Sequence, residues 1–269
     1  NIHILDPFTG TGTFMVRLLQ SGLIDIKDLE RKYKDELHAN EIVLLAYYIA
    51  AINIENAYHD ATPDPNDGVG KTNYKPFDGI VLTDTFQMSE TNHGEIQYEE
   101  FLKKNSDRVE KQKKAPLRVI IGNPPYSRGQ ENANDNAQNQ TYPKLQNRIL
   151  NTYAVGNEST LSRDLYNSYI KAFRWSTDRI SKDGGIIAFI TGNGIIDKLS
   201  YAGFRKSLEN EFSSIYILNL RGDVRGKSRE DSKREGQSVF DIMTGVCITI
   251  LVKKDTNHKA TIWYEKTLD

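Results

Sequence analysis

The sequence contains a single cysteine, Cys247, which lies in an apolar stretch. No disulfide can therefore form within the chain, which suits a reducing compartment. Long apolar runs are also missing: none approaches the roughly 20 residues that a membrane-spanning helix needs. The N-terminus lacks the charged-then-apolar pattern of a signal peptide. We therefore expect a cytoplasmic protein with no membrane partner.

An excess of charge of either sign is absent as well. Lys and Arg total 35 and Asp and Glu total 36, so the net charge of -1 neither predicts nor excludes a polyanionic partner. His and Cys residues at the spacing of a zinc site are missing, and we predict no metal. The hydrophobic fraction of 38% is enough to form a substantial core, in one large domain or two small ones.

Short apolar segments alternate with longer helical patterns, which is typical of a mostly parallel sheet with helices on both faces. The last two expected strands are separated by a loop, which favours an antiparallel pair that closes the sheet. The chain begins at Asn1 directly in a strand-like segment, and we expect a fragment of a longer polypeptide. The expected strands are residues 2–5, 36–40, 78–83, 117–121, 186–191, 215–220 and 246–252, and the expected helices are residues 13–20, 28–34, 42–58, 164–180 and 201–212.

The stretch "ILDPFTGTGTF" places Asp6 at the end of the first strand and Gly10 and Gly12 at the start of a helix. Glycines let the backbone approach a ligand closely, and a helix N-terminus offers free amides. The dinucleotide fingerprint requires a small residue where Met15 stands, and the lysine of a phosphate-binding loop is missing. An acid at a strand end suits a cationic ligand, so the stretch points toward S-adenosylmethionine. A glycine-rich turn without a ligand is the alternative.

Two further acids follow later strands. Glu41 follows the second strand, where a carboxylate can accept ribose hydroxyls, and Asp84 follows the third, where it could accept from an adenine amine beside Phe86. Taken alone, each acid is more often a helix cap or a solvated loop residue. Their recurrence at successive strand ends favours a cofactor site.

The stretch "VIIGNPPYSR" interrupts the fourth strand with a stiff turn. Pro124 and Pro125 remove two backbone donors, while Asn123 adds a side-chain acceptor and Tyr126 a flat ring. The Asn123 side-chain oxygen and the Pro124 carbonyl could hold the two hydrogens of a planar amino group, with Tyr126 stacked on its plane. Such positioning needs no strong general base. By itself Asn-Pro-Pro is only a turn, but its place downstream of the glycine turn favours an amine site.

"DPFTGTGTF" followed by "NPPY" resembles the gamma arrangement of the methyltransferases that modify the exocyclic amine of adenine in DNA. "LYNSYIKAFRWSTDRI", "GGIIAFITGNGII" and "VFDIMTGVCITILVKK" resemble later segments of bacterial restriction-modification methyltransferases, especially the methyltransferase region of type ISP single-polypeptide enzymes. The resemblance covers nearly the whole chain. It implies an α/β fold, namely a Rossmann-like methyltransferase with a mostly parallel seven-stranded sheet, helices on both faces and an antiparallel C-terminal strand.

The resemblance also implies roles for individual residues, with S-adenosylmethionine as the cofactor. Asp6 would contact the methionine moiety, Glu41 the ribose and Asp84 the adenine amine of that cofactor. The catalytic residues that would hold the target adenine are Asn123, Pro124, Pro125 and Tyr126. The complete set expected to bind the cofactor is Asp6, Pro7, Phe8, Gly10, Gly12, Glu41, Asp84 and Phe86.

The implied partner is double-stranded DNA, with the target adenine flipped out of the helix. Covalently linked nuclease, helicase-like and target-recognition domains would complete a longer polypeptide. Residues 1–255 would then form the methyltransferase core, without the cofactor segment that usually precedes it, and residues 256–269 would start a following region.

Other residues are weaker candidates for contact with DNA. Phe240 could be a second stacking residue, although an aromatic residue before a strand is usually part of the core. Residues 127–139 and 221–234 could order against phosphates, although solvated loops are the default for such segments. Their arginines are Arg128, Arg221, Arg225 and Arg229.

Two other functions stay open. An Asn-Pro-Pro-Tyr turn also suits the planar amide of a protein glutamine, and a module that only binds DNA or assembles could keep this fold without activity. The charged final loop and the length of the resemblance favour DNA as the substrate. Intact Asp6, Asn123 and Tyr126 argue against a loss of activity.

Overall fold

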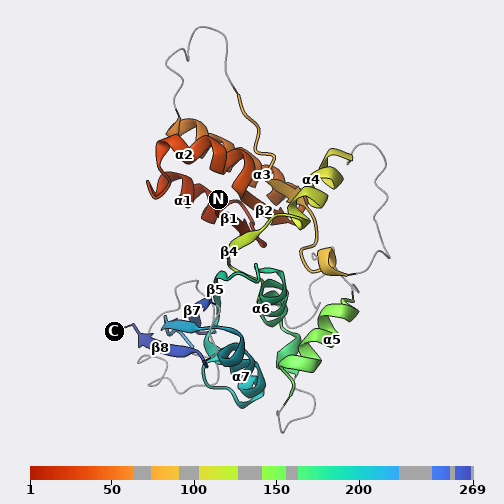
Figure 1. The fold of residues 1–269 in the computed structure, drawn as a ribbon, viewed down its shortest axis with the longest axis vertical. Coiled ribbons are helices and arrows are strands. Elements are labelled where there is room, and N and C mark those ends of the chain that lie inside the picture. Colours follow the sequence, from red (N-terminus) through yellow and green to blue (C-terminus); the bar gives the residue numbers. More distant parts are fainter. Residues whose placement is uncertain are drawn as a thin grey trace. The chain divides into compact units, whose positions relative to one another are not determined.

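The computed structural model describes residues 1–62, 74–90, 103–126, 141–155, 163–223, 244–254 and 258–267. It divides into two compact units, which are unit 1 (Asn1–Gly122) and unit 2 (Asn123–Asp269) (Figure 1). Across the described residues, no helix is both long enough and apolar enough to cross a membrane.

The described strands of unit 1 all run parallel, in the order β3-β2-β1-β4. Their bounds are β1 (His3–Asp6), β2 (Leu37–Glu41), β3 (Ile80–Leu82) and β4 (Leu117–Gly122). The helices are α1 (Thr13–Gln20), α2 (Ile26–Arg31), α3 (Leu44–Ala61) and α4 (Lys103–Lys113), and a π-helical turn (Lys32–Glu36) leads into β2. Because the strands are parallel, their carboxyl ends lie at one edge of the sheet.

Helices α1 and α3 pack against each other, as Figure 1 shows. Met15 of α1 and Ala50 and Ile54 of α3 are buried, together with Leu37 of β2. Fully burying a large apolar side chain contributes about 1.5–3 kcal/mol. This packing holds the start of α1, and with it the glycine turn, at the end of β1.

In unit 2 the strand order is β5-β7-β6-β8, with β7 antiparallel to both neighbours and β8 parallel to β6. The strands are β5 (Gly185–Gly192), β6 (Ser214–Asn219), β7 (Val246–Lys253) and β8 (Thr261–Lys266). The helices are α5 (Pro143–Thr152), α6 (Ser168–Arg179) and α7 (Ala202–Glu211). Short 3-10 turns span Gln87–Ser89 in unit 1 and Arg163–Tyr166, Asn193–Ile195 and Leu199–Tyr201 in unit 2.

One face of the unit 2 sheet lies in the core. Phe189 of β5 packs edge-on against Phe173 of α6, with ring centroids 5.3 Å apart, and Phe173 also contacts Phe204 of α7. The next residues along the strands point the other way, since side chains alternate between faces. Tyr216 and Trp263 on that second face are 40% and 45% exposed.

The predicted α/β class is confirmed, with a mostly parallel arrangement and antiparallel pairing near the C-terminus. The described residues form eight strands instead of the predicted seven, because β8 was not expected. The segment Thr261–Lys266 (TIWYEK) has no strict apolar–polar alternation that would predict a strand, and its side chains are all exposed. Helix α5 was missed as well. The division of the chain after residue 255 stays a prediction, and β8 lies beyond it.

Candidate functional site

The glycine turn links β1 to α1 through two left-handed residues. Gly10 has φ 57° and Gly12 has φ 91°, a region that residues with a side chain rarely adopt. A Cβ at Gly12 would lie 3.2 Å from Ile54 Cγ1 and 3.3 Å from the backbone of Ala50. Gly12 therefore allows α1 to begin against α3. Gly12, the N-cap residue, has no side chain to cap this helix N-terminus.

Asp6 is fully buried at the end of β1. Its Oδ1 accepts the backbone N–H of Phe8 at 3.1 Å, whereas Oδ2 has no hydrogen-bond partner among the described residues. Burial, assisted by the carboxylate of Glu41, raises the pKa of Asp6 to about 7, and the Phe8 N–H opposes this shift. A buried carboxylate with an open oxygen favours a cation beside it, because a cation offsets the cost of burying the charge.

Glu41 joins the end of β2 to the glycine turn. Its Oε2 accepts the N–H of Gly10 at 2.8 Å, and its Oε1 accepts the N–H groups of Ile42 and Val43 at 2.9 and 2.8 Å. The structure thus brings Asp6, Gly10 and Glu41 together at one edge of the unit 1 sheet, as the sequence predicts. The contact of Glu41 with a ribose stays a prediction.

Asp84 and Phe86 follow β3 at the same edge. Asp84 Oδ1 accepts the N–H of Phe86 at 2.9 Å and that of Gln87 at 3.4 Å, so one of its oxygens stabilises its own turn. Phe86 is only 7% exposed and packs against Phe8, with ring centroids 5.5 Å apart. The predicted contacts of Asp84 and Phe86 with an adenine stay predictions.

Two buried residues that were not predicted from the sequence, Asn40 and Thr85, connect the loops after β1, β2 and β3. Asn40 donates from Nδ2 to Thr85 Oγ1 at 3.1 Å, and Thr85 Oγ1 donates to the Pro7 carbonyl at 2.6 Å. The backbone carbonyl of Asn40 accepts the N–H of Thr9 at 2.9 Å. The loops after β1, β2 and β3 are therefore one hydrogen-bonded assembly. The sequence signal that could have predicted this role is an asparagine within a buried strand, directly before Glu41.

The Asn-Pro-Pro-Tyr segment begins unit 2 and directly follows Gly122, the last residue of β4. Asn123 and Pro125 are exposed and Pro124 is buried. Tyr126 is half-buried, and its hydroxyl has no hydrogen-bond partner among the described residues. Burial, with a smaller contribution from the Cys247 thiol, raises the pKa of Tyr126 well above its usual range. The turn thus leaves the Asn123 amide accessible beside a neutral aromatic ring.

Several predicted contacts with DNA fall outside the described residues. Residues 127–139, Arg225, Arg229 and Phe240 are among them. Arg221 is described: its N–H donates to Asn219 Oδ1 at 3.0 Å and its carbonyl accepts the N–H of Val246 at 3.0 Å. These backbone contacts join the ends of β6 and β7, and a contact of the Arg221 side chain with phosphate stays a prediction.

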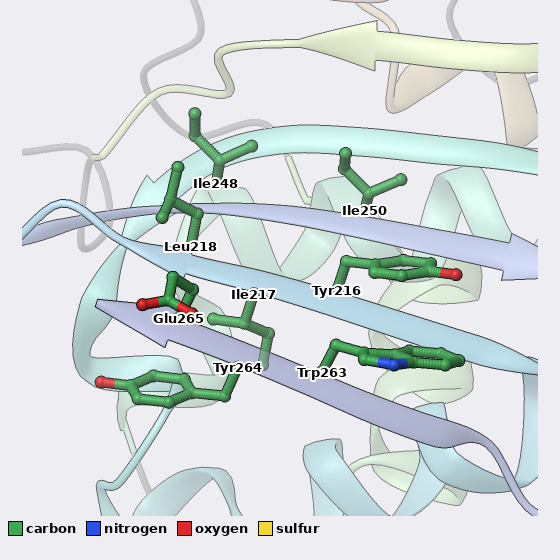
Figure 2. A pocket seen from close by; sticks show the side chains of 8 residues that line it. All are labelled: Tyr216, Ile217, Leu218, Ile248, Ile250, Trp263, Tyr264 and Glu265. Carbon is green, nitrogen blue, oxygen red and sulfur yellow. The ribbon is translucent and has the colours of Figure 1, made fainter. Parts of the chain in front are cut away.

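A groove of about 410 Å³ lies on the exposed side of the unit 2 sheet (Figure 2). Figure 2 shows the Tyr216 and Trp263 side chains next to each other on this face. Their rings are stacked, with centroids 4.5 Å apart. None of the predicted site residues lines this groove. Its lining residues are Tyr216, Ile217, Leu218, Ile248, Ile250, Trp263, Tyr264 and Glu265.

The parallel strands, the acidic glycine turn and the Asn-Pro-Pro-Tyr segment are the features that the resemblance to α/β methyltransferases predicts. Residues 29–224 match the family model described as Eco57I restriction-modification methylase. The match covers more than half of the chain, and the chain belongs to this family. Membership supports a methyltransferase role.

Solved structures agree with this assignment. The chain is 47% identical to part of the ATP-dependent type ISP restriction-modification enzyme LlaBIII bound to DNA, with a TM-score of 0.88 over 98% of this chain and 18% of that one. It is 42% identical to part of a nuclease-deletion mutant of the type ISP enzyme LlaGI in complex with a DNA substrate mimic, with a TM-score of 0.87 over 98% of this chain and 21% of that one. The chain thus spans about a fifth of the length of these enzymes.

A more distant structure shares the fold. It is a putative class I S-adenosylmethionine-dependent methyltransferase from Listeria monocytogenes, 15% identical, with a TM-score of 0.50 over 99% of this chain and 58% of that one. No curated protein matches the chain.

Proposed function

We propose that this chain transfers a methyl group from S-adenosylmethionine to the exocyclic N6 amine of an adenine flipped out of double-stranded DNA. The observation that carries the proposal is the Asn-Pro-Pro-Tyr turn at the end of a parallel strand. It combines an exposed amide at Asn123 with a half-buried aromatic ring at Tyr126. These two groups match the edge and the face of a planar amino-substituted base.

The residues of unit 1 fit the cofactor. Asp6 offers a buried carboxylate oxygen without a partner among the described residues, which suits the ammonium of a methionine moiety. Gly10 and Gly12 bring the backbone of the turn close to such a ligand, and Glu41 lies beside them where a ribose would be held. When bound, S-adenosylmethionine supplies a methyl group activated by its sulfonium.

The chain's own residues would orient the acceptor. The Asn123 side-chain oxygen and the Pro124 carbonyl accept the two hydrogens of the adenine amine, which directs the nitrogen lone pair at the methyl carbon. S-adenosylmethionine would supply the methyl group, its carbon–sulfur bond breaking as the carbon–nitrogen bond forms, and the surplus proton would leave the amine for solvent. Holding the reacting atoms in line supplies most of the acceleration, since well-oriented reactants gain about 7–11 kcal/mol over free ones.

The biological setting is also part of the proposal. Two similar enzymes were solved with DNA or a DNA mimic and are several times longer than this chain. We therefore propose that the chain works in the bacterial cytoplasm as the methylating part of a larger restriction-modification polypeptide, with nuclease, helicase-like and target-recognition domains covalently attached.

Substitution of Asn123 tests the proposal. Asn123→Ala should abolish transfer of labelled methyl groups to unmethylated genomic DNA in the full-length enzyme, while the affinity for S-adenosylmethionine stays within several-fold. Asn147→Ala is the matched control, because Asn147 is an exposed asparagine on α5 of the same unit. Full activity of Asn123→Ala would remove the amine-holding role, and methylation of a glutamine peptide instead of DNA would identify the rival substrate.

A further inference from the structure

Asn167 occupies the position before the first residue of α6, where asparagine usually caps a helix. A capping asparagine accepts a backbone N–H of the first turn with its side-chain oxygen. The Asn167 side chain makes no such bond, although its backbone carbonyl accepts the N–H groups of Ile170 and Lys171 at 3.0 and 3.1 Å. The residue is only 2% exposed, and its Oδ1 has no partner among the described residues. Its side chain is therefore committed to something other than the helix.

That commitment is to two tyrosine hydroxyls. Asn167 Nδ2 donates to the hydroxyls of Tyr201 and Tyr169 at 2.9 and 3.2 Å. The two hydroxyls also share a hydrogen bond of 2.7 Å. All three residues are buried, at 2%, 0% and 7% exposure. This closed triangle, the Asn167 cluster, fixes the phenol of Tyr169 at its polar end.

The ring of Tyr169 contacts the proposed acceptor site. Its centroid lies 6.2 Å from that of Tyr126, at an interplanar angle of 60°, which is within the range of favourable tilted aromatic pairs. The Tyr126 hydroxyl makes no hydrogen bond with the described residues, so the contact with the Tyr169 ring is available to orient this side chain. The Tyr169 ring also lies 6.4 Å from the ring of Tyr201, and the Tyr201 ring lies 6.2 Å from that of Phe204.

Accepting the proposed adenine methylation as its basis, we propose that Asn167, Tyr169 and Tyr201 are positioning residues that set the plane of Tyr126 for stacking on the target base. Asn167 and Tyr201 hold the Tyr169 hydroxyl, and the Tyr169 ring supports the Tyr126 ring. The Asn167 side chain bonds the two tyrosine hydroxyls in place of a backbone N–H of α6, as a residue that positions the Tyr169 phenol would. A residue at an N-cap position whose side chain does not cap its helix is the kind of departure from local preference that is expected at functional sites.

The decisive variant is Tyr169→Phe in the full-length enzyme, because it keeps the ring and removes only the hydroxyl anchor. The target position is first mapped by sequencing methylated genomic DNA. One synthetic duplex then carries adenine at that position for the rate of methyl transfer, and a second carries 2-aminopurine, which lacks the N6 amine, for the emission. We expect kcat for methyl transfer to fall about tenfold, with KM for S-adenosylmethionine unchanged. The emission of 2-aminopurine in the complex should rise, since a poorly aligned tyrosine quenches it less. Tyr201→Phe should shift both readouts in the same direction.

Tyr153→Phe is the matched control. Tyr153 is a fully buried tyrosine of unit 2, packed on Phe204 and Arg174, and it has no part in the proposed pocket. It should leave kcat and the emission unchanged even if the melting temperature falls. If Tyr169→Phe and Tyr201→Phe both keep wild-type kcat and emission while Asn123→Ala is inactive, the cluster has no positioning role and the proposed function stands. Full activity of Asn123→Ala would instead overturn the proposed function itself.

Discussion

The carboxylate of Glu41 holds the glycine turn through the backbone N–H of Gly10, at 2.8 Å. Its other oxygen accepts two more N–H groups from the start of the following loop. A glutamine cannot replace it, because the amide nitrogen would face an N–H donor on one side or the other.

We therefore predict that Glu41→Gln weakens binding of S-adenosylmethionine and lowers the free energy of unfolding by about 1–3 kcal/mol, the usual effect of leaving a buried donor unpaired. Urea unfolding and calorimetry measure the two quantities. Glu30→Gln is the control, since Glu30 forms an exposed ion pair with Lys75 and should change stability by less than about 0.5 kcal/mol. Equal effects of the two substitutions would show that Glu41 does not hold the turn.

Two glycines of unit 1 allow backbone strain to be separated from packing. Gly12 and Gly22 both have positive φ, 91° and 72°. A Cβ added at Gly12 would have neighbours within 4 Å, whereas a Cβ added at Gly22 would have none. Alanine at Gly22 should cost about 1–2 kcal/mol through the left-handed backbone alone. Gly12→Ala should cost more and also weaken cofactor binding, because α1 must move away from α3. Thermal unfolding of the two variants measures the difference, and equal losses would mean that the close approach of the helices is unimportant.

The sequence predicted the parts of this site that depend on local signals. Asp6, Gly10 and Gly12 stand out because an acid and two glycines occupy a strand-to-helix turn, and α1 has the predicted bounds. Asn40, Thr85 and Asn167 were not predicted as site residues, because each forms a side-chain hydrogen bond with a residue far away along the chain. The separations are 45 residues for Asn40 with Thr85, 78 for Thr85 with Pro7 and 34 for Asn167 with Tyr201. The predicted helix at residues 164–180 is interrupted at Asn167, where the side chain turns to the two tyrosines. Only the tertiary contacts show that the Asn167 side chain bonds the tyrosine hydroxyls instead of capping the helix.

Asp6 makes cofactor binding dependent on pH. Its pKa of about 7 in the free protein means that the buried carboxyl is mostly protonated at pH 6. A cationic ligand binds the ionised form, so binding at pH 6 should release close to one proton, and affinity should rise with pH until about 7 and then level off. Calorimetry in two buffers of different ionisation enthalpy measures the proton release. Asp6→Asn should bind weakly at every pH and release none.

The same group has an opposite effect on stability without the cofactor. Because the pKa of Asp6 is higher in the folded protein than its usual value of 3.8, the folded state binds more protons between these two pH values. Its contribution to stability is fully present below about pH 4 and is lost as pH rises through 7. Asp6→Asn should therefore be relatively more stable at pH 8 than at pH 5. A pH-independent difference between variant and wild type would show that Asp6 ionises normally.

Tyr126 should matter most when the target base is hardest to extract. Stacking of a base on an aromatic side chain is worth about 1–3 kcal/mol, and this energy offsets part of the cost of unpairing and unstacking the adenine. Tyr126→Ala should lower the rate of methyl transfer to a paired duplex by about tenfold to a hundredfold. A mismatched target adenine is already partly unstacked, and the loss on that substrate should be smaller. Tyr126→Phe should retain most of the activity on both substrates, because the Tyr126 hydroxyl makes no hydrogen bond with the described residues. Rates of labelled-methyl incorporation into the two duplexes measure the effect, and equal losses on both would mean that Tyr126 acts after the base has left the helix.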